Sequence, residues 1–277
     1  MNVIQDVHKD REDLARVLKK HTGLRKFVED LYPDKAHFIY ELLQNAEDRG
    51  TTAVRFALSP DRLRFEHDGE PFRPQDIYAI TDIGEGTKAN DDDKIGRFGV
   101  GFKAVFAYSE TPHILSPTYS FKITDLVLPI GIEPVADLNG ETRFIFPFNN
   151  PKKPAADAFR EIQSGLEELA ETTLLFLRHI DSISWTIEGA GSGEIMRIAY
   201  ASGHIEILKS LSGSTATSLH FLKFERPVDG LPRQSVAVAF PLDFLPGSAG
   251  FSARKPLCDQ LKIVPASSGQ VAVFFPA

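Results

Sequence analysis

Two polar side chains that could take part in a reaction lie one helical turn apart in the stretch from residue 41 to residue 48. Glu41 and Asn45 are four residues apart and Asp48 is seven from Glu41, so a helix places all three on one face. The amide oxygen of Asn45 is a hard ligand suited to Mg²⁺, and the Glu41 carboxylate can orient or deprotonate a water molecule. A solvated polar face on a surface helix is the alternative, and such spacing is common there.

A glycine-rich run follows later in the chain, and it is typical of phosphate-binding loops. Its residues are Gly96, Arg97, Phe98, Gly99, Val100, Gly101 and Phe102. Glycine allows a close approach of the backbone to a ligand, and the start of the helix expected from residue 103 to 108 offers unpaired N–H groups to an anion. The spacing matches neither the dinucleotide fingerprint nor the P-loop. A flexible loop or a close contact between a helix and a strand remains the alternative.

Two smaller polar groups lie at the ends of expected strands. His67, Asp68 and Gly69 end one strand, and Thr142 opens another. An aspartate at the end of a strand can accept a hydrogen bond from an exocyclic amine, although Asp-Gly is more often only a turn. The Thr142 hydroxyl could join the same polar group, but a β-branched residue in a strand requires no function.

Hydrophobic periodicity and turn residues predict the elements that must position these side chains. We expect helices near residues 9–31, 35–48, 75–80, 103–108 and 155–178. Strands are expected at 53–58, 62–66, 114–115, 119–123, 142–146, 182–187, 195–200, 204–208, 218–224 and 235–240. This order predicts an α+β fold with a helical layer on a mixed, mainly antiparallel sheet. We expect one domain over residues 1–190 and an antiparallel, β-rich extension over residues 191–277. The apolar stretch at 271–275 suggests that the chain continues in a longer protein.

Charge and composition limit the classes of function. A net charge of −7 and a pI near 5.6 argue against a broad nucleic-acid-binding surface. Cys258 is the single cysteine, so the chain can form no internal disulfide and no cysteine-rich metal site. The charged N-terminus lacks an apolar signal core, and no apolar run approaches the roughly 20 residues that span a bilayer. These features predict a cytoplasmic protein without membrane contact.

Taken in order, the four polar groups resemble the ATP-binding motifs of the gyrase, heat-shock protein 90, histidine-kinase and MutL (GHKL) superfamily. Residues 41–48 resemble its N-box, residues 67–69 its adenine loop, residues 96–102 its closing glycine box, and Thr142 the threonine that follows. Residues 84–94, with Lys88, resemble the ATP lid. The amino-acid sequences of these motifs are most similar to those of the heat-shock protein 90-like domain of sacsin and its prokaryotic relatives. The resemblance implies a Bergerat-type ATP-binding sandwich.

The resemblance also implies roles for individual residues. Glu41 would be the general base or water-orienting residue, and Asn45 would hold the Mg²⁺ that bridges the phosphates of ATP. Asp48 would brace the pocket. The remaining ATP-binding positions implied are His67, Asp68, Gly69, Lys88, Gly96, Arg97, Phe98, Gly99, Val100, Gly101, Phe102 and Thr142. Lys94 and Lys103 also lie near enough in sequence to offset phosphate charge.

The adenine loop departs from the superfamily pattern. The superfamily aspartate stands two residues before the first glycine, where this chain has His67, and Pro71 occupies the position of the second glycine. Either Asp68 reads the adenine amine after a shift of the loop, or His67 does so as a neutral acceptor.

The function implied is Mg²⁺-dependent hydrolysis of ATP to ADP. It would be coupled to lid closure and to formation of a nucleotide-dependent homodimer in a chaperone-like or remodelling protein. The alternative is a nucleotide-binding or interaction module without turnover.

Overall fold

The structure is a computed structural model, and it describes residues 2–21, 23, 38–83, 101–229, 231–248 and 250–265. The helices are α1 (Val3–Lys20), α3 (Phe38–Glu47), α4 (Pro74–Ile80) and α5 (Ala155–Glu167). The 3₁₀ helices are η1 (Gly101–Ala107), η2 (Glu171–Leu174), η3 (Ala201–Gly203) and η4 (Leu257–Asp259). The strands are β1 (Ala53–Ser59), β2 (Arg62–His67), β3 (His113–Leu115), β4 (Ser120–Thr124), β5 (Leu128–Gly131), β6 (Thr142–Pro147), β7 (Ser182–Ile187), β8 (Gly191–Ala199), β9 (His204–Leu211), β10 (Thr217–Val228), β11 (Leu231–Phe244) and β12 (Leu261–Ile263).

All twelve strands form one continuous sheet in the order β12-β11-β10-β9-β8-β7-β1-β2-β6-β3-β4-β5. Among the described strands, β1 and β7 form the parallel pair, and the other neighbours run antiparallel. The expectation of a mainly antiparallel sheet is met. The boundary predicted at residue 190 falls in the turn between β7 and β8, which pair with each other.

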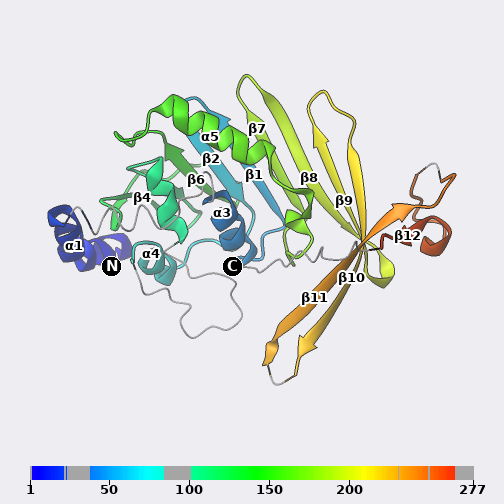
Figure 1. The fold of residues 1–277 in the computed structure, drawn as a ribbon. Coiled ribbons are helices and arrows are strands. Elements are labelled where there is room, and N and C mark those ends of the chain that lie inside the picture. The colour runs from blue at the N-terminus through cyan, green and yellow to red at the C-terminus, as the bar shows by residue number, and fades with distance from the viewer. Residues whose placement is uncertain are drawn as a thin grey trace.

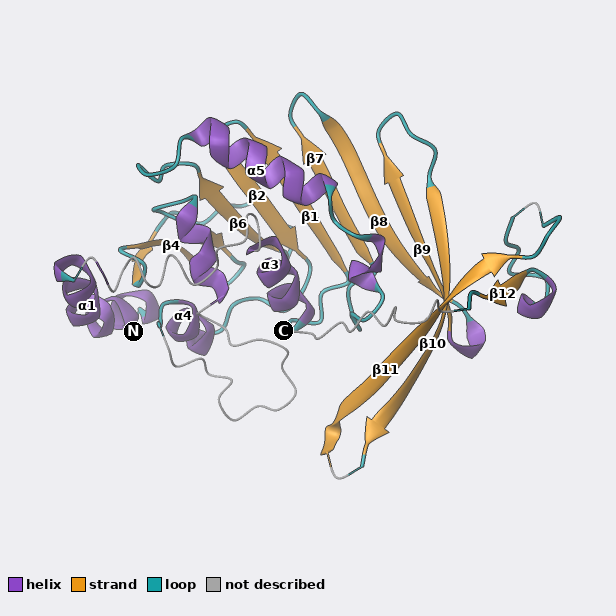
Figure 2. Cartoon of the chain, viewed as in Figure 1, coloured by secondary structure: helices purple, strands orange, loops and turns teal. Residues whose placement is uncertain are grey.

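The helices gather on one face of the sheet (Figure 1). In Figure 2, α5 crosses in front of the central strands, and α3 lies below it. Contacts join α5 to β1 and α3 to η1. This arrangement places α3, with Glu41 and Asn45, above the ends of β1 and β2, where the expected adenine loop begins.

Phenylalanine side chains fill the space between this helical layer and the sheet. Ring centroids are 4.8 Å apart for Phe56 and Phe65, 5.8 Å for Phe65 and Phe144, and 6.1 Å for Phe144 and Phe146. Phe102 on η1 joins the cluster from the helical side, 6.1 Å from Phe144. Aromatic pairs at these distances contribute about 0.5–1.5 kcal/mol each beyond their buried area. The cluster therefore holds η1 firmly over β6.

Several element bounds differ from the predicted ones. Helix α1 begins at Val3 rather than near residue 9, because the Asn2 side chain caps it by accepting the Ile4 N–H at 3.2 Å. Helix α5 ends at Glu167 rather than near residue 178, and the following turn η2 buries Leu174 in a separate segment. The helix expected after the glycine run is a 3₁₀ helix. Strand β5 was not predicted.

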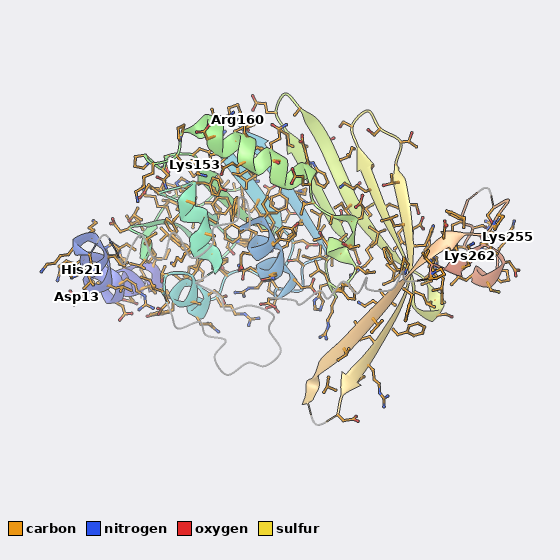
Figure 3. All side chains as sticks on the ribbon, viewed as in Figure 1. Asp13, His21, Lys153, Arg160, Lys255 and Lys262 are labelled. Carbon is orange, nitrogen blue, oxygen red and sulfur yellow. The ribbon has the colours of Figure 1, made fainter. Side chains whose placement is uncertain are left out.

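The β10–β11 hairpin leaves the main body of the molecule (Figure 1). Apolar side chains on it are exposed, among them Phe224 and Val236, which are 54% and 60% accessible. Figure 3 shows Lys255 and Lys262 at the end of the molecule opposite Asp13 of α1 and His21, which follows that helix. Within the described ranges, no helix combines the length and apolar character that would cross a membrane.

Candidate functional site

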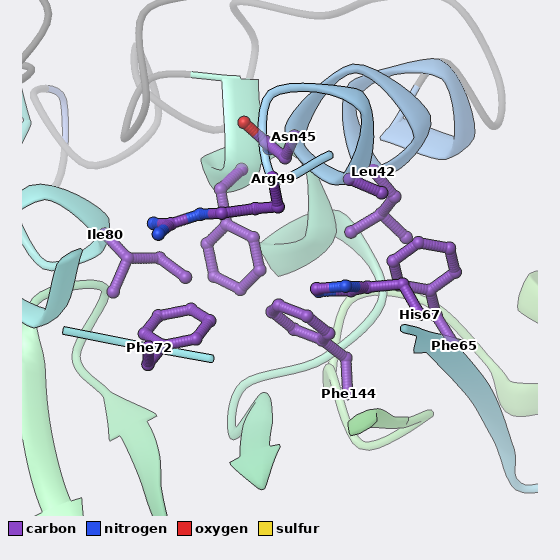
Figure 4. Close-up of a pocket in the computed structure, with 10 residues that line it drawn as sticks. Leu42, Asn45, Arg49, Phe65, His67, Phe72, Ile80 and Phe144 are labelled. Atoms are coloured by element: carbon purple, nitrogen blue, oxygen red, sulfur yellow. The ribbon is translucent and has the colours of Figure 1, made fainter. Parts of the chain in front are cut away.

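A hollow lies between α3, the ends of β2 and β6, and η1 (Figure 4). Its walls are mostly apolar, with an amide, an imidazole and a guanidinium among them. The lining residues are Leu42, Asn45, Ala46, Arg49, Phe65, His67, Phe72, Ile80, Phe102 and Phe144. Apolar walls with a few polar groups are typical of small-molecule sites. The hollow therefore brings together three predicted site residues: Asn45, His67 and Phe102.

Helix α3 divides its residues between the core and the site. Leu42, Leu43 and Ala46 are almost fully buried, whereas Glu41 and Asn45 are half-buried on another side of the helix. The Glu41 carboxylate lies against Gly101, so closely that a Cβ atom on that glycine would overlap it. The structure thus places Glu41 beside Gly101, two residues that the resemblance assigns to one site.

His67 ends β2 as a buried neutral imidazole. Burial lowers its pKa to about 4, and the positive charge of Arg49 acts in the same direction, while Asp68 opposes it. The ring nitrogen Nδ1 accepts the Gly69 backbone N–H at 3.2 Å and lies 3.3 Å from the Thr51 hydroxyl. Figure 4 shows the ring beside Phe144, directed toward the hollow. His67, rather than Asp68, thus forms part of the wall.

The Asp68 carboxylate is engaged outside the hollow. It accepts the backbone N–H groups of Thr52 at 2.8 Å and Ala53 at 3.1 Å, and also the Thr52 hydroxyl. Burial alone would raise the pKa of Asp68, but these hydrogen bonds outweigh it and hold the pKa below its usual value. Asp68 fastens the start of β1 to the end of β2, and it is not among the residues that line the hollow.

Arg49 spans the hollow from the end of α3 (Figure 4). Its guanidinium pairs with Asp76 of α4 and lies 5.7 Å from the centroid of the Phe72 ring. The enclosed volume is about 10 Å³, close to what one water molecule needs. Entry of a larger ligand therefore requires that these side chains separate, and the Arg49–Asp76 pair is the polar link across the opening.

Glu47, within the predicted N-box, fixes α3 to the sheet. It is 2% exposed and accepts the backbone N–H groups of Arg178 at 2.6 Å, His179 at 2.9 Å and Ile180 at 3.0 Å. The His179 Nδ1 atom lies 3.1 Å from the same carboxylate. One carboxylate thus joins the end of α3 to the segment that enters β7, and this contact fixes the position of α3 relative to the sheet.

Lys103, considered in the sequence as a group to offset phosphate charge, is fully buried instead. Its Nζ donates to the carbonyls of Ile80 and Leu126, each at 2.7 Å. Burial lowers the pKa of Lys103 to about 7. The ammonium therefore supports the wall of the hollow through Ile80 and does not point into it.

The other predicted site residues are distributed as follows. Thr142 is buried opposite His67 in the β2–β6 register, with its hydroxyl 3.4 Å from that of Ser116. Gly69 packs against Arg49 and Thr51, where a Cβ would not fit. Asp48 lies in the turn after α3 and is not among the lining residues. Lys88, Lys94, Gly96, Arg97, Phe98, Gly99 and Val100 lie outside the described residues.

Comparisons with known proteins show a distant similarity in sequence. The family model described as "Sacsin domain" matches residues 65–126, which run from the end of β2 to just after β4. Sacsin of Homo sapiens is 25% identical over 70% of the chain. The chain is sacsin-like in sequence. Protein NO VEIN of Arabidopsis thaliana is also 25% identical, over 87% of the chain. The chain spans only 5% of the length of sacsin and 10% of that of NO VEIN.

Most of the lining residues were not predicted as site residues from the sequence, and neither was the supporting Glu47. Phe144 shares a strand face with Thr142, so the two-residue periodicity of β6 contained the signal. Arg49 and Glu47 belong to a polar run after Asn45, and their partners lie 27 and more than 130 residues away. Such distant pairings have no local signature.

Proposed function

We propose that the hollow binds the base side of ATP, that Glu41 and Asn45 face its phosphates, and that the site hydrolyses ATP with Mg²⁺. The observation that carries the proposal is the contact between the Glu41 carboxylate and Gly101, one helical turn from Asn45 at the wall of an apolar hollow. A site for an adenine nucleotide needs an apolar slot next to a polar edge, and this arrangement supplies both.

The donor set is suitable for magnesium. No cluster of three or more His, Cys, Asp or Glu side chains that could hold a metal exists in the part of the chain that is described. Mg²⁺ in nucleotide sites usually needs only one or two protein oxygens, since phosphates and waters complete its six ligands. The Asn45 amide oxygen would be such a ligand. The bound ion would offset the negative charge of the phosphates.

Glu41 would act on the attacking water. In hydrolysis the water oxygen forms a bond to the terminal phosphorus, the bond from that phosphorus to the bridging oxygen breaks, and one water proton passes to a base. The half-buried Glu41 carboxylate, beside a glycine that leaves it room, is placed to accept that proton. Hydrolysis would be coupled to closure of the expected lid over residues 84–94 and to association of two copies.

The similarity to sacsin supports a sacsin-related role, as one part of a larger chaperone-like or remodelling protein. The matched region includes the end of β2 and η1, the two elements that carry His67 and Phe102.

Calorimetry and a phosphate-release assay test the proposal together. We expect Mg²⁺-dependent binding of ATP, and a loss of at least about 100-fold in turnover for Glu41→Ala with binding retained. Glu188→Ala, an exposed carboxylate in the turn after β7, is the matched control and should behave as the parent. Asn45→Ala should lose the Mg²⁺ dependence of binding.

Absence of ATP binding at millimolar concentration would refute the proposal. Binding without turnover in the parent chain would favour a nucleotide-binding module instead. Sedimentation with a non-hydrolysable analogue tests association. The dimer fraction should rise when the analogue is added, and Glu188→Ala should show the same rise as the parent.

A further inference from the structure

The hydrogen-bond pattern around His67 determines which ring nitrogen carries the proton. The Gly69 N–H donates to Nδ1 at 3.2 Å, so Nδ1 must offer its lone pair. The Thr51 hydroxyl, 3.3 Å away, can donate to the same atom. A neutral imidazole has one N–H, and here it must be on Nε2. Gly69 can approach because it has no Cβ, which would overlap Thr51.

Nε2 is left available to a ligand. Among the described residues it has no hydrogen-bond partner, while the ring lines the hollow. In the described ranges, Arg11 Nε is the one side-chain nitrogen or oxygen that is fully enclosed and has no partner. Nε2 of His67 also has no partner but does not belong to that class, so it is not fully enclosed and stays accessible from the hollow. The wall therefore presents an N–H donor to whatever occupies the slot.

The Asp68 carboxylate, the other candidate for contact with the base, accepts its hydrogen bonds outside the hollow. Both oxygens of Asp68 accept hydrogen bonds from Thr52 and Ala53, and Asp68 does not line the hollow. An exocyclic amine of a base would need an acceptor at this edge. A ring nitrogen or a carbonyl oxygen of a base would instead find the donor that it needs.

We propose that His67 reads the nucleotide base as a hydrogen-bond donor, so that the site accepts a purine through N1 or a carbonyl at position 6 and does not select the adenine amine. This inference rests on the proposed nucleotide-binding function. Its consequence is that a 6-oxopurine triphosphate binds as well as ATP. The probe is inosine triphosphate (ITP), whose base differs from adenine by a carbonyl in place of the amine and a proton on N1.

Competition between ATP and ITP for the full chain tests this reading. We expect the dissociation constant of ITP to lie within threefold of that of ATP, or below it. His67→Asp replaces the donor with an acceptor and should weaken ITP relative to ATP by at least tenfold. Asp68→Asn is the matched control beside it and should leave the ratio unchanged.

A parent protein that binds ATP more than threefold tighter than ITP overturns the inference and leaves the proposed function intact. A ratio that shifts with Asp68→Asn but not with His67→Asp also overturns it. If neither nucleotide binds, the proposed function fails and this inference fails with it.

A ligand-free measurement covers the case in which His67→Asp does not fold. A long-range ¹H–¹⁵N NMR spectrum of the parent at neutral pH should assign the His67 proton to Nε2. A proton on Nδ1 would overturn the inference without reference to any nucleotide.

Discussion

Replacement of Glu47 by alanine should destabilise the fold by about 3–5 kcal/mol, because a buried carboxylate that accepts three backbone hydrogen bonds is removed. Three backbone N–H groups, of Arg178, His179 and Ile180, would lose their acceptor. An unsatisfied buried N–H costs about 1–3 kcal/mol, and only the Ile180 group is fully buried, so the sum is less than three full penalties. Glu47→Gln keeps one acceptor oxygen but turns an NH₂ toward these donors, so about half of the loss remains.

Urea unfolding at pH 7, followed by circular dichroism, measures this effect. The midpoint should fall while the slope stays constant, since the surface exposed on unfolding is unchanged. The exposed Glu188→Ala is the control and should change the free energy of unfolding by no more than about 0.5 kcal/mol. A loss below about 1 kcal/mol for Glu47→Ala would refute the view that this carboxylate holds the 178–180 segment under α3.

Three further predictions concern the site. The folded pKa of His67, about 4, lies below its unfolded value of 6.5, so its contribution to stability is complete above pH 6.5 and is lost as the pH falls toward 4. That loss is on the order of 3 kcal/mol. Urea titrations at pH 7 and pH 4 should therefore show a larger drop in the free energy of unfolding for the parent than for His67→Gln. An equal drop in the two proteins would contradict the prediction. Gly101→Ala should displace the flexible end of the Glu41 side chain, so turnover should fall as in Glu41→Ala. The free energy of unfolding, measured by thermal unfolding, should change by less than about 1 kcal/mol. Retained turnover would count against the role of Glu41. Lys103→Met should cost about 2–4 kcal/mol in urea unfolding because the carbonyls of Ile80 and Leu126 lose their donor, and a neutral result would mean that water replaces the ammonium.

Local patterns predicted much of the scaffold. The alternation in β1, β2 and β7 placed these strands within a residue or two of their ends, and the turn at Pro60 and Asp61 joins an antiparallel pair as expected. The apolar stripe of α3 predicted which side of the helix faces the core. Errors occurred where tertiary packing decides: α5 ends early because Leu174 is buried through a separate turn.

The site could be predicted only in part. The four-residue spacing of Glu41 and Asn45 and the glycine run identified α3 and η1 as candidate site elements, and the structure places the two in contact. The choice between His67 and Asp68 could not be made from the sequence, because it depends on Thr52 and Gly69, which select the partners of each side chain in space. Arg49 and Asp76 likewise meet only after α4 has docked.

The continuous sheet has a practical consequence for any shortened form of the protein. Strand β7 has six residues and pairs with β1 on one side and β8 on the other. A chain that ended at residue 190 would leave the second side of β7 as an open edge, with Ile183, Trp185 and Ile187 in that strand. Open edges of this kind recruit further strands and promote aggregation. Self-association of such a fragment would then reflect an unsatisfied backbone, and it should be distinguished from association that depends on nucleotide.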